Sequence, residues 1–121
     1  MRIEAEDQSR FIQLLAQLDQ VARRCTDIQY RSRKRYYEAM RRFCVYLADE
    51  SQISSLEDIS AEHLKGYIGQ LRARHKTEKT IKMELSAIRF FHDRMPYAKG
   101  WLPDNRKLGI DVGNSRSCWF D

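Results

Sequence analysis

Four segments of this chain carry apolar residues at steps of three and four, the spacing that gathers them on one face of an α-helix. Three of these stripes are Phe11, Leu14, Leu15, Leu18, Val21 and Ala22; then Tyr36, Met40, Phe43, Cys44 and Leu47; then Leu64, Tyr67, Ile68 and Leu71. An alternating apolar and polar run, typical of a strand, never lasts more than a few residues. The pattern therefore predicts an all-α domain, with helices over 9–24, 31–49, 60–74 and 77–94.

The fourth segment is apolar on two sides, which is typical of a helix that lies between neighbours. One arc consists of Ile81, Leu85, Ile88 and Met95, with Phe91 at its edge, and the other of Met83, Ala87 and Phe90. The remaining arc is polar and mainly basic: Lys79, Lys82, Ser86, Arg89 and Asp93. We expect one shared core made of Tyr36, Met40, Phe43, Leu47, Leu64, Ile68, Leu71, Ile81, Leu85 and Ile88.

Several residues mark the expected ends of these helices. Ser9, Ser60 and Thr77 are predicted N-caps, and Pro96 should end the fourth helix because the residue before proline avoids the α region. Gly66 and Gly69 are either tolerated inside the third helix or allow another helix, or DNA, to come close.

The segment 54–59 is expected to be a connection with one tight turn. Residues 100–121 have no period and predict an extended or mobile tail, although Trp101, Leu102, Leu108 and Ile110 could fold part of it back. We therefore expect a helical domain over 1–99 and a linker or tail over 100–121.

The charge is unevenly distributed along the chain, whose net charge is +5. Residues 1–22 carry −2, residues 23–42 carry +6, residues 43–62 carry −5 with no Lys or Arg, residues 63–99 carry +6, and the remainder is neutral. Two separate segments thus hold the positive charge. If they are neighbours in space, they form one surface suited to the phosphates of a nucleic acid.

The sequence offers little support for catalysis, metal binding or membrane insertion. His63, His75 and His92 lack metal-ligand spacing, and His75 and His92 are interpreted as packed or interfacial side chains. No phosphate-binding glycine loop or nucleophile motif is present, so no cofactor is expected. Three widely spaced cysteines, an acidic N-terminus and no long apolar run favour a reduced, cytoplasmic protein without a membrane segment.

The order of the motifs resembles the N-terminal core-binding domain of the tyrosine recombinase (phage integrase) family, a SAM-like four-helix module. The resemblance covers about residues 28–110 and is carried by YEAMRRFCVYL at 37–47, SLEDISAEHL at 55–64 and KTIKMELSAIRFFH at 79–92. It implies that the basic arcs of the second and fourth helices clamp double-stranded DNA at a recombination site. The family's catalytic His-x-x-Arg and tyrosine positions have no counterpart in this chain, so the resemblance implies a DNA-binding module that is not itself an enzyme, with a catalytic domain absent from this chain.

The expected DNA contacts, mostly to phosphate, are Arg31, Lys34, Arg35, Arg41, Arg42, Lys76, Thr77, Lys79, Thr80, Lys82, Ser86 and Arg89. Other recombinase protomers on the same site are possible partners. The alternative function is a helical protein–protein interaction module, in which the acidic block at 43–62 meets a basic block on another copy. A SAM-like bundle is a fold, and a fold does not determine function.

Overall fold

A computed structural model describes residues 5–95, 102–103 and 106–108. Four α-helices follow one another: α1 (Ala5–Arg23), α2 (Tyr30–Glu50), α3 (Ala61–Ala73) and α4 (Glu78–His92). A 3-10 turn, η1 (Leu56–Asp58), lies between α2 and α3. The described residues include no strand, and the predicted all-α bundle is confirmed.

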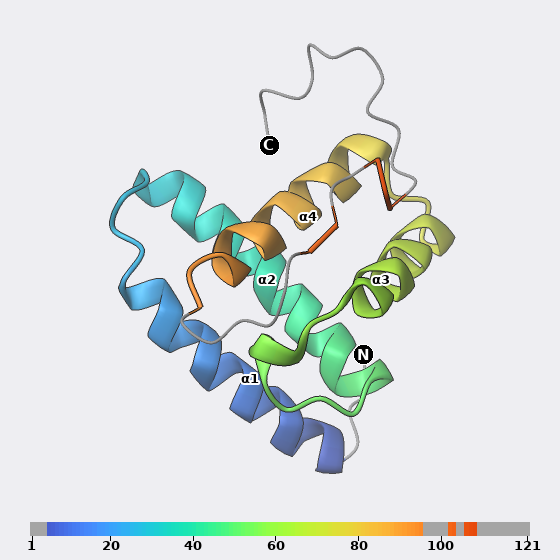
Figure 1. Ribbon diagram of the computed structural model, residues 1–121, viewed down its shortest axis with the longest axis horizontal. Coiled ribbons are helices and arrows are strands. Elements are labelled where there is room, and N and C mark those ends of the chain that lie inside the picture. Colours follow the sequence, from blue (N-terminus) through green and yellow to red (C-terminus); the bar gives the residue numbers. More distant parts are fainter. Residues whose placement is uncertain (1–4, 96–101, 104–105, 109–121) are drawn as a thin grey trace.

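The helix α2 is the centre of the bundle (Figure 1). It packs most extensively against α1, which precedes it through a short connection, and against α4. Helix α3 contacts α2 and α4, and η1 lies against α1. The two helices expected to carry positive charge are therefore direct neighbours.

One apolar core joins all four helices. Nine of the ten expected core residues are buried in it, namely Met40, Phe43, Leu47, Leu64, Ile68, Leu71, Ile81, Leu85 and Ile88, whereas Tyr36 is partly buried at its edge. Both arcs of α4 are covered, since Phe91 and Ala87 are fully buried and Phe90 packs against the core. The two-sided pattern of α4 was thus a correct sign of a helix between neighbours.

Two of the predicted N-caps are confirmed and one is wrong. Ser60 precedes α3, and the Thr77 hydroxyl accepts a hydrogen bond from the backbone N–H of Thr80 at 3.1 Å. Ser9 is not a cap, because α1 begins at Ala5 and Ser9 lies exposed inside the helix. Helix α4 ends at His92, and Pro96 lies outside the described residues.

The end of α3 corrects the interpretation of His75. This residue is exposed and has a φ of 61°, the left-handed conformation that usually belongs to glycine after a helix. The backbone N–H of Lys76 donates to the Leu71 carbonyl at 3.0 Å, and that of His75 to the Arg72 carbonyl at 2.9 Å. His75 therefore ends the helix and does not extend its apolar stripe, whereas His92 is packed as predicted.

Part of the segment after residue 100 returns to the helices. Leu108 is buried in the core, Leu102 packs against it, and the Arg89 guanidinium donates to the Pro103 carbonyl at 2.8 Å. Trp101 and Ile110, which were expected to contribute, lie outside the described residues. The described residues 102–103 and 106–108 therefore include parts that pack against the helices.

Candidate nucleic-acid interface

A buried carboxylate lies where α2, α3 and α4 meet. Glu84 of α4 is only 2% exposed, a rare environment for a carboxylate unless it is paired. The Arg42 guanidinium of α2 donates to both of its oxygens, through Nε at 3.2 Å and Nη2 at 2.5 Å. The Tyr67 hydroxyl of α3 donates to Oε1 at 2.7 Å. These three side chains tie the three helices together.

The electrostatics of this cluster keep the proton on both donors. The hydrogen bond to Glu84 raises the pKa of Arg42 above its ordinary value. Burial, and then the bond to the Glu84 carboxylate, raise the pKa of Tyr67 well above that of a free tyrosine. Arg42 keeps 54% of its side chain in solvent, so it neutralises Glu84 and still presents charge at the surface.

Above the cluster is a hollow of about 640 Å³ between α2, α3 and the start of α4. It is lined by Arg42 of α2, by Arg74 and Lys76 of the connection between α3 and α4, and by Thr80 of α4. Its inner lining includes Tyr46 and Leu71, as well as Tyr67 and Glu84 themselves. Three cations facing one carboxylate leave the hollow with an excess of positive charge, which suits an anionic group.

The predicted cations of α2 divide between two sides of the helix. At 100° per residue, Arg31, Arg35 and Arg42 fall within about 40° of one another. Lys34 and Arg41 lie about 80–100° further round, toward α1. The Arg41 guanidinium lies 5.5 Å from the ring centre of Phe11 in α1, which agrees with this direction. Only the first set continues toward the hollow.

The basic arc of α4 does not face α2. Lys82, Ser86 and Arg89 lie roughly 140–200° around the helix from Glu84, the residue that reaches Arg42. Ser86 is buried and Arg89 is half-buried against the Pro103 carbonyl, so residues 102–103 lie on that side. The two basic arcs expected to share one surface therefore point to different sides. Of the contacts expected from this segment, Lys76 and Thr80 line the hollow together with Arg42 of α2.

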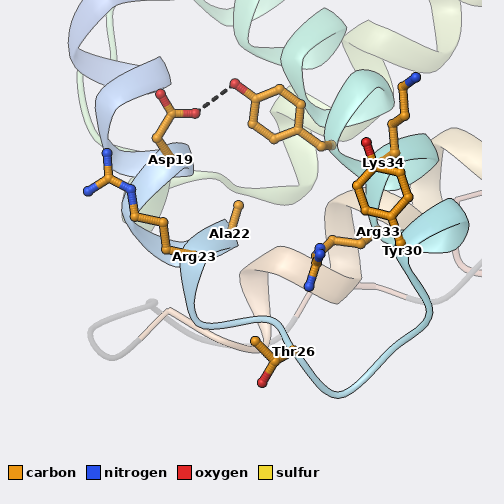
Figure 2. Close-up of a pocket in the computed structure, with 8 residues that line it drawn as sticks. Asp19, Ala22, Arg23, Thr26, Tyr30, Arg33 and Lys34 are labelled. Atoms are coloured by element: carbon orange, nitrogen blue, oxygen red, sulfur yellow. Dashed lines mark hydrogen bonds between the residues drawn. The ribbon is translucent and has the colours of Figure 1, made fainter.

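A second concavity, of about 520 Å³, lies between the end of α1 and the start of α2 (Figure 2). We call it the α1–α2 groove. It is lined by Asp19, Ala22, Arg23, Thr26, Tyr30, Arg33, Lys34 and Tyr37. The Tyr37 hydroxyl of α2 donates to Asp19 of α1 at 2.6 Å and bridges the two helices. The dashed line at Asp19 in Figure 2 marks this bond. Burial and this bond raise the pKa of Tyr37 to about 12, so the hydroxyl stays a donor.

Sequence reasoning missed two residues of the hollow. Glu84 was counted only as one acid in a basic segment. The feature that could have identified it is its position on α4, opposite the cationic arc. Arg74 was absent from the expected contacts because it follows the last turn of α3, outside both basic arcs. The positive charge of Arg74 can be read from the sequence, but its proximity to Arg42, 32 residues earlier, cannot.

Other chemistry finds no support in the described part of the chain. Its cysteines, Cys25 and Cys44, are free and buried, and burial raises the pKa of both thiols, that of Cys44 to about 12. Cys118 lies outside the described residues. Within the described ranges, no His, Cys, Asp and Glu group could hold a metal ion, and no helix is long and apolar enough to cross a membrane.

Comparison with known proteins identifies the domain. A family model described as the phage integrase N-terminal SAM-like domain matches residues 10–95. The matched region is the SAM-like domain and includes no catalytic domain. Comparison with curated proteins and with solved structures gave no significant match.

Proposed function

Because this chain belongs to the phage integrase family through its N-terminal SAM-like domain, we propose that it is the DNA-binding module of a site-specific tyrosine recombinase. In this proposal it holds duplex DNA and contributes affinity and position. Strand cleavage and joining require the catalytic domain, which is not part of the matched region. Its partners are then double-stranded DNA and other recombinase protomers on the same site.

The observation that carries the proposal is the convergence of positive charge on one side of the bundle. The exposed row of Arg31, Arg35 and Arg42 on α2 leads to the hollow where Arg74 and Lys76 lie beside Thr80. Phosphate groups supply most hydrogen-bond partners in protein–DNA complexes, and Arg, Lys and Thr are suitable donors. We call these six residues, with the flanking Thr77 and Lys79, the α2–α4 face.

The other predicted contacts have different surroundings. Lys34 and Arg41 lie at the α1 edge of α2 and are proposed as outer contacts of the same face. Lys82, Ser86 and Arg89 remain predictions for a second DNA segment on the far side of α4. Ser86 would have to become exposed before it could bind DNA, because it is buried in the free domain.

The test is the salt dependence of binding to a random duplex. Each phosphate contact releases counterions, so the logarithm of affinity should fall with the logarithm of salt by about 0.9 per contact. We expect the double variant Arg74→Ala with Lys76→Ala to flatten this slope by roughly one to two units, and to weaken all sequences alike. Fluorescence anisotropy at several salt concentrations measures both.

The matched control is Arg106→Ala with Lys107→Ala, an exposed basic pair outside the hollow. It should leave the slope nearly unchanged. An equal effect of the two pairs would mean that binding reflects only the overall charge. Absence of duplex binding by the unmodified chain at low salt would contradict the proposed function itself. We also expect no covalent adduct between the chain and supercoiled DNA.

A further inference from the structure

The two ends of α2 carry opposite charge. The basic end, where α1 meets α2, holds Arg23, Arg24, Arg31, Arg33, Lys34 and Arg35, and the acidic end holds Asp49, Glu50, Glu57, Asp58 and Glu62. Figure 1 shows the start and the end of α2 on opposite sides of the bundle; a loop leads from its end to η1, which lies against α1. Helix α2 has 21 residues, a length of about 30 Å. Since charges are screened over about 8–10 Å at physiological salt, the two ends of one molecule cannot neutralise each other.

The α1–α2 groove gives the basic end a defined shape. Its single carboxylate, Asp19, already accepts the bond from Tyr37. Arg33 is held in place, since it donates to the Cys25 carbonyl at 2.9 Å and lies over the Tyr30 ring. Arg23 and Lys34 stand on the two walls of the groove, one from α1 and the other from α2 (Figure 2). Among the described residues neither has an acidic partner.

The exposed Tyr30 ring adds an apolar wall to the groove. This side chain is 67% exposed, one of two large apolar side chains so exposed in the described part of the chain. A ring beside two cations suits a protein segment that brings carboxylates together with some apolar surface.

The acidic end has the complementary properties. The backbone N–H of Leu56 donates to the Gln17 side chain at 2.6 Å, and Leu56 itself is fully buried, so the η1 turn is fixed to α1. Glu50 and Glu57 have no cationic partner among the described residues. The nearest stretch of sequence, 43–62, supplies no Lys or Arg.

We propose that the α1–α2 groove of one molecule receives the acidic end of a second copy, so that copies of this chain associate with opposite ends in contact. One such contact neutralises unpaired charge on both molecules at once. Lys34 lies about 80° around α2 from the α2–α4 face, so a molecule bound through the groove covers one outer DNA contact, Lys34, and leaves the face itself accessible to DNA. The proposed association does not require DNA, so it can be tested independently of the proposed DNA-binding function.

The experiment uses the full chain without DNA in sedimentation velocity runs at low and at high salt. The unmodified chain should associate in a concentration-dependent way at low salt and dissociate at high salt. Arg23→Glu with Lys34→Glu reverses the charge on both walls of the groove, and Glu50→Lys with Glu57→Lys reverses two charges at the acidic end. Each double variant alone should lose affinity for itself by about tenfold or more.

An equimolar mixture of the two double variants should associate again, because each then offers the charge that the other lacks. This recovery excludes misfolding as the reason for the loss. The matched control is Arg106→Glu with Lys107→Glu, which changes the net charge by the same amount and should associate like the unmodified chain.

Three results would overturn the proposal. The first is an unmodified chain that stays monomeric at low salt. The second is a control pair that weakens association as much as the groove pair. The third is unchanged self-association of the Arg23→Glu, Lys34→Glu variant, which would mean that the groove does not form the contact between copies.

Discussion

At the scale of single residues, Gly66 and Gly69 lie on one helix but in different surroundings. A Cβ on Gly66 would collide with the Tyr46 hydroxyl, whereas a Cβ on Gly69 would meet nothing within 4 Å. The Tyr46 ring cannot easily move aside, because it packs against Phe43 and Tyr67 with ring centres 6.1 and 5.2 Å away. Gly66 therefore allows α2 to approach α3, and Gly69 is merely tolerated.

The two glycines should consequently respond to alanine in opposite directions. Gly66→Ala should lower the free energy of unfolding by about 1–3 kcal/mol, because it forces the packed ring to shift. Gly69→Ala should raise it by about 0.5–1 kcal/mol through better helix propensity. Urea unfolding of the two variants measures both values, and effects of the same sign would contradict the assigned contact.

Arg42 has a structural task besides its charge at the surface. Removing it leaves the Glu84 carboxylate buried with only Tyr67 as a donor. We expect Arg42→Ala to lower the free energy of unfolding by about 1–3 kcal/mol, less than for a fully buried pair because half of Arg42 is in solvent. Adding Glu84→Gln to that variant should recover part of the loss, since a neutral amide needs no counterion.

This effect decides how DNA-binding data on Arg42 are interpreted. A weaker complex with Arg42→Ala mixes a lost phosphate contact with a disturbed junction of three helices. If Glu84→Gln recovers no stability in urea unfolding, the pairing seen here does not stabilise the fold. Arg74 and Lys76 are the cleaner probes of the surface, because neither bonds to Glu84.

At the scale of elements, the start of α3 depends on a histidine. The Nδ1 atom of His63 accepts a hydrogen bond from the backbone N–H of Ser60 at 2.9 Å, the place where glutamate or glutamine usually acts in a capping box. Partial burial lowers the pKa of His63 below its ordinary value, and nearby Asp58 and Glu62 oppose this only in part. Protonation at Nδ1 would abolish the bond.

The bond makes the stability of the bundle sensitive to acid. The pKa of His63 is lower in the folded chain than in the unfolded one, so the unfolded chain binds the proton more readily and stability falls as the pH drops through about 6.5. His63→Gln retains an acceptor at this position and should keep the stability near pH 7 within about 0.5 kcal/mol. The decrease between pH 7 and pH 5, followed by thermal unfolding, should be smaller in this variant.

Part of the decrease should persist in that variant, because burial also lowers the pKa of His92. An identical pH profile for the variant and the unmodified chain would show that His63 does not cap α3.

At the scale of the whole molecule, the core includes a residue that follows the last helix. Leu108 is 8% exposed and belongs to the same cluster as Leu85, which is fully buried. We expect Leu85→Ala to lower the free energy of unfolding by about 2–5 kcal/mol and Leu108→Ala by about 2 kcal/mol. Urea unfolding measures both, and a loss below about 1 kcal/mol at Leu85 would mean that this arc of α4 is misassigned.

The positions of the helices and most of the core could be predicted from the sequence. The steps between Met40, Phe43 and Leu47, or between Ile81, Leu85 and Ile88, report a helical face directly, because the period of a helix is a local property. The start of α1 was placed four residues too late, since a serine that resembles a cap is equally acceptable on an exposed helix surface.

The interface depended on contacts between residues distant in sequence. Charge counting found both basic segments, but only the packing of α2 against α4 directed Lys82 and Arg89 away from Arg42. The position of α3 brought Arg74 toward Arg42. The burial of Glu84 likewise depends on a partner 42 residues away. Periodicity determines which face of a helix is apolar, whereas the rotation of one helix against another, set by how side chains of different helices fit together, decides which charges meet.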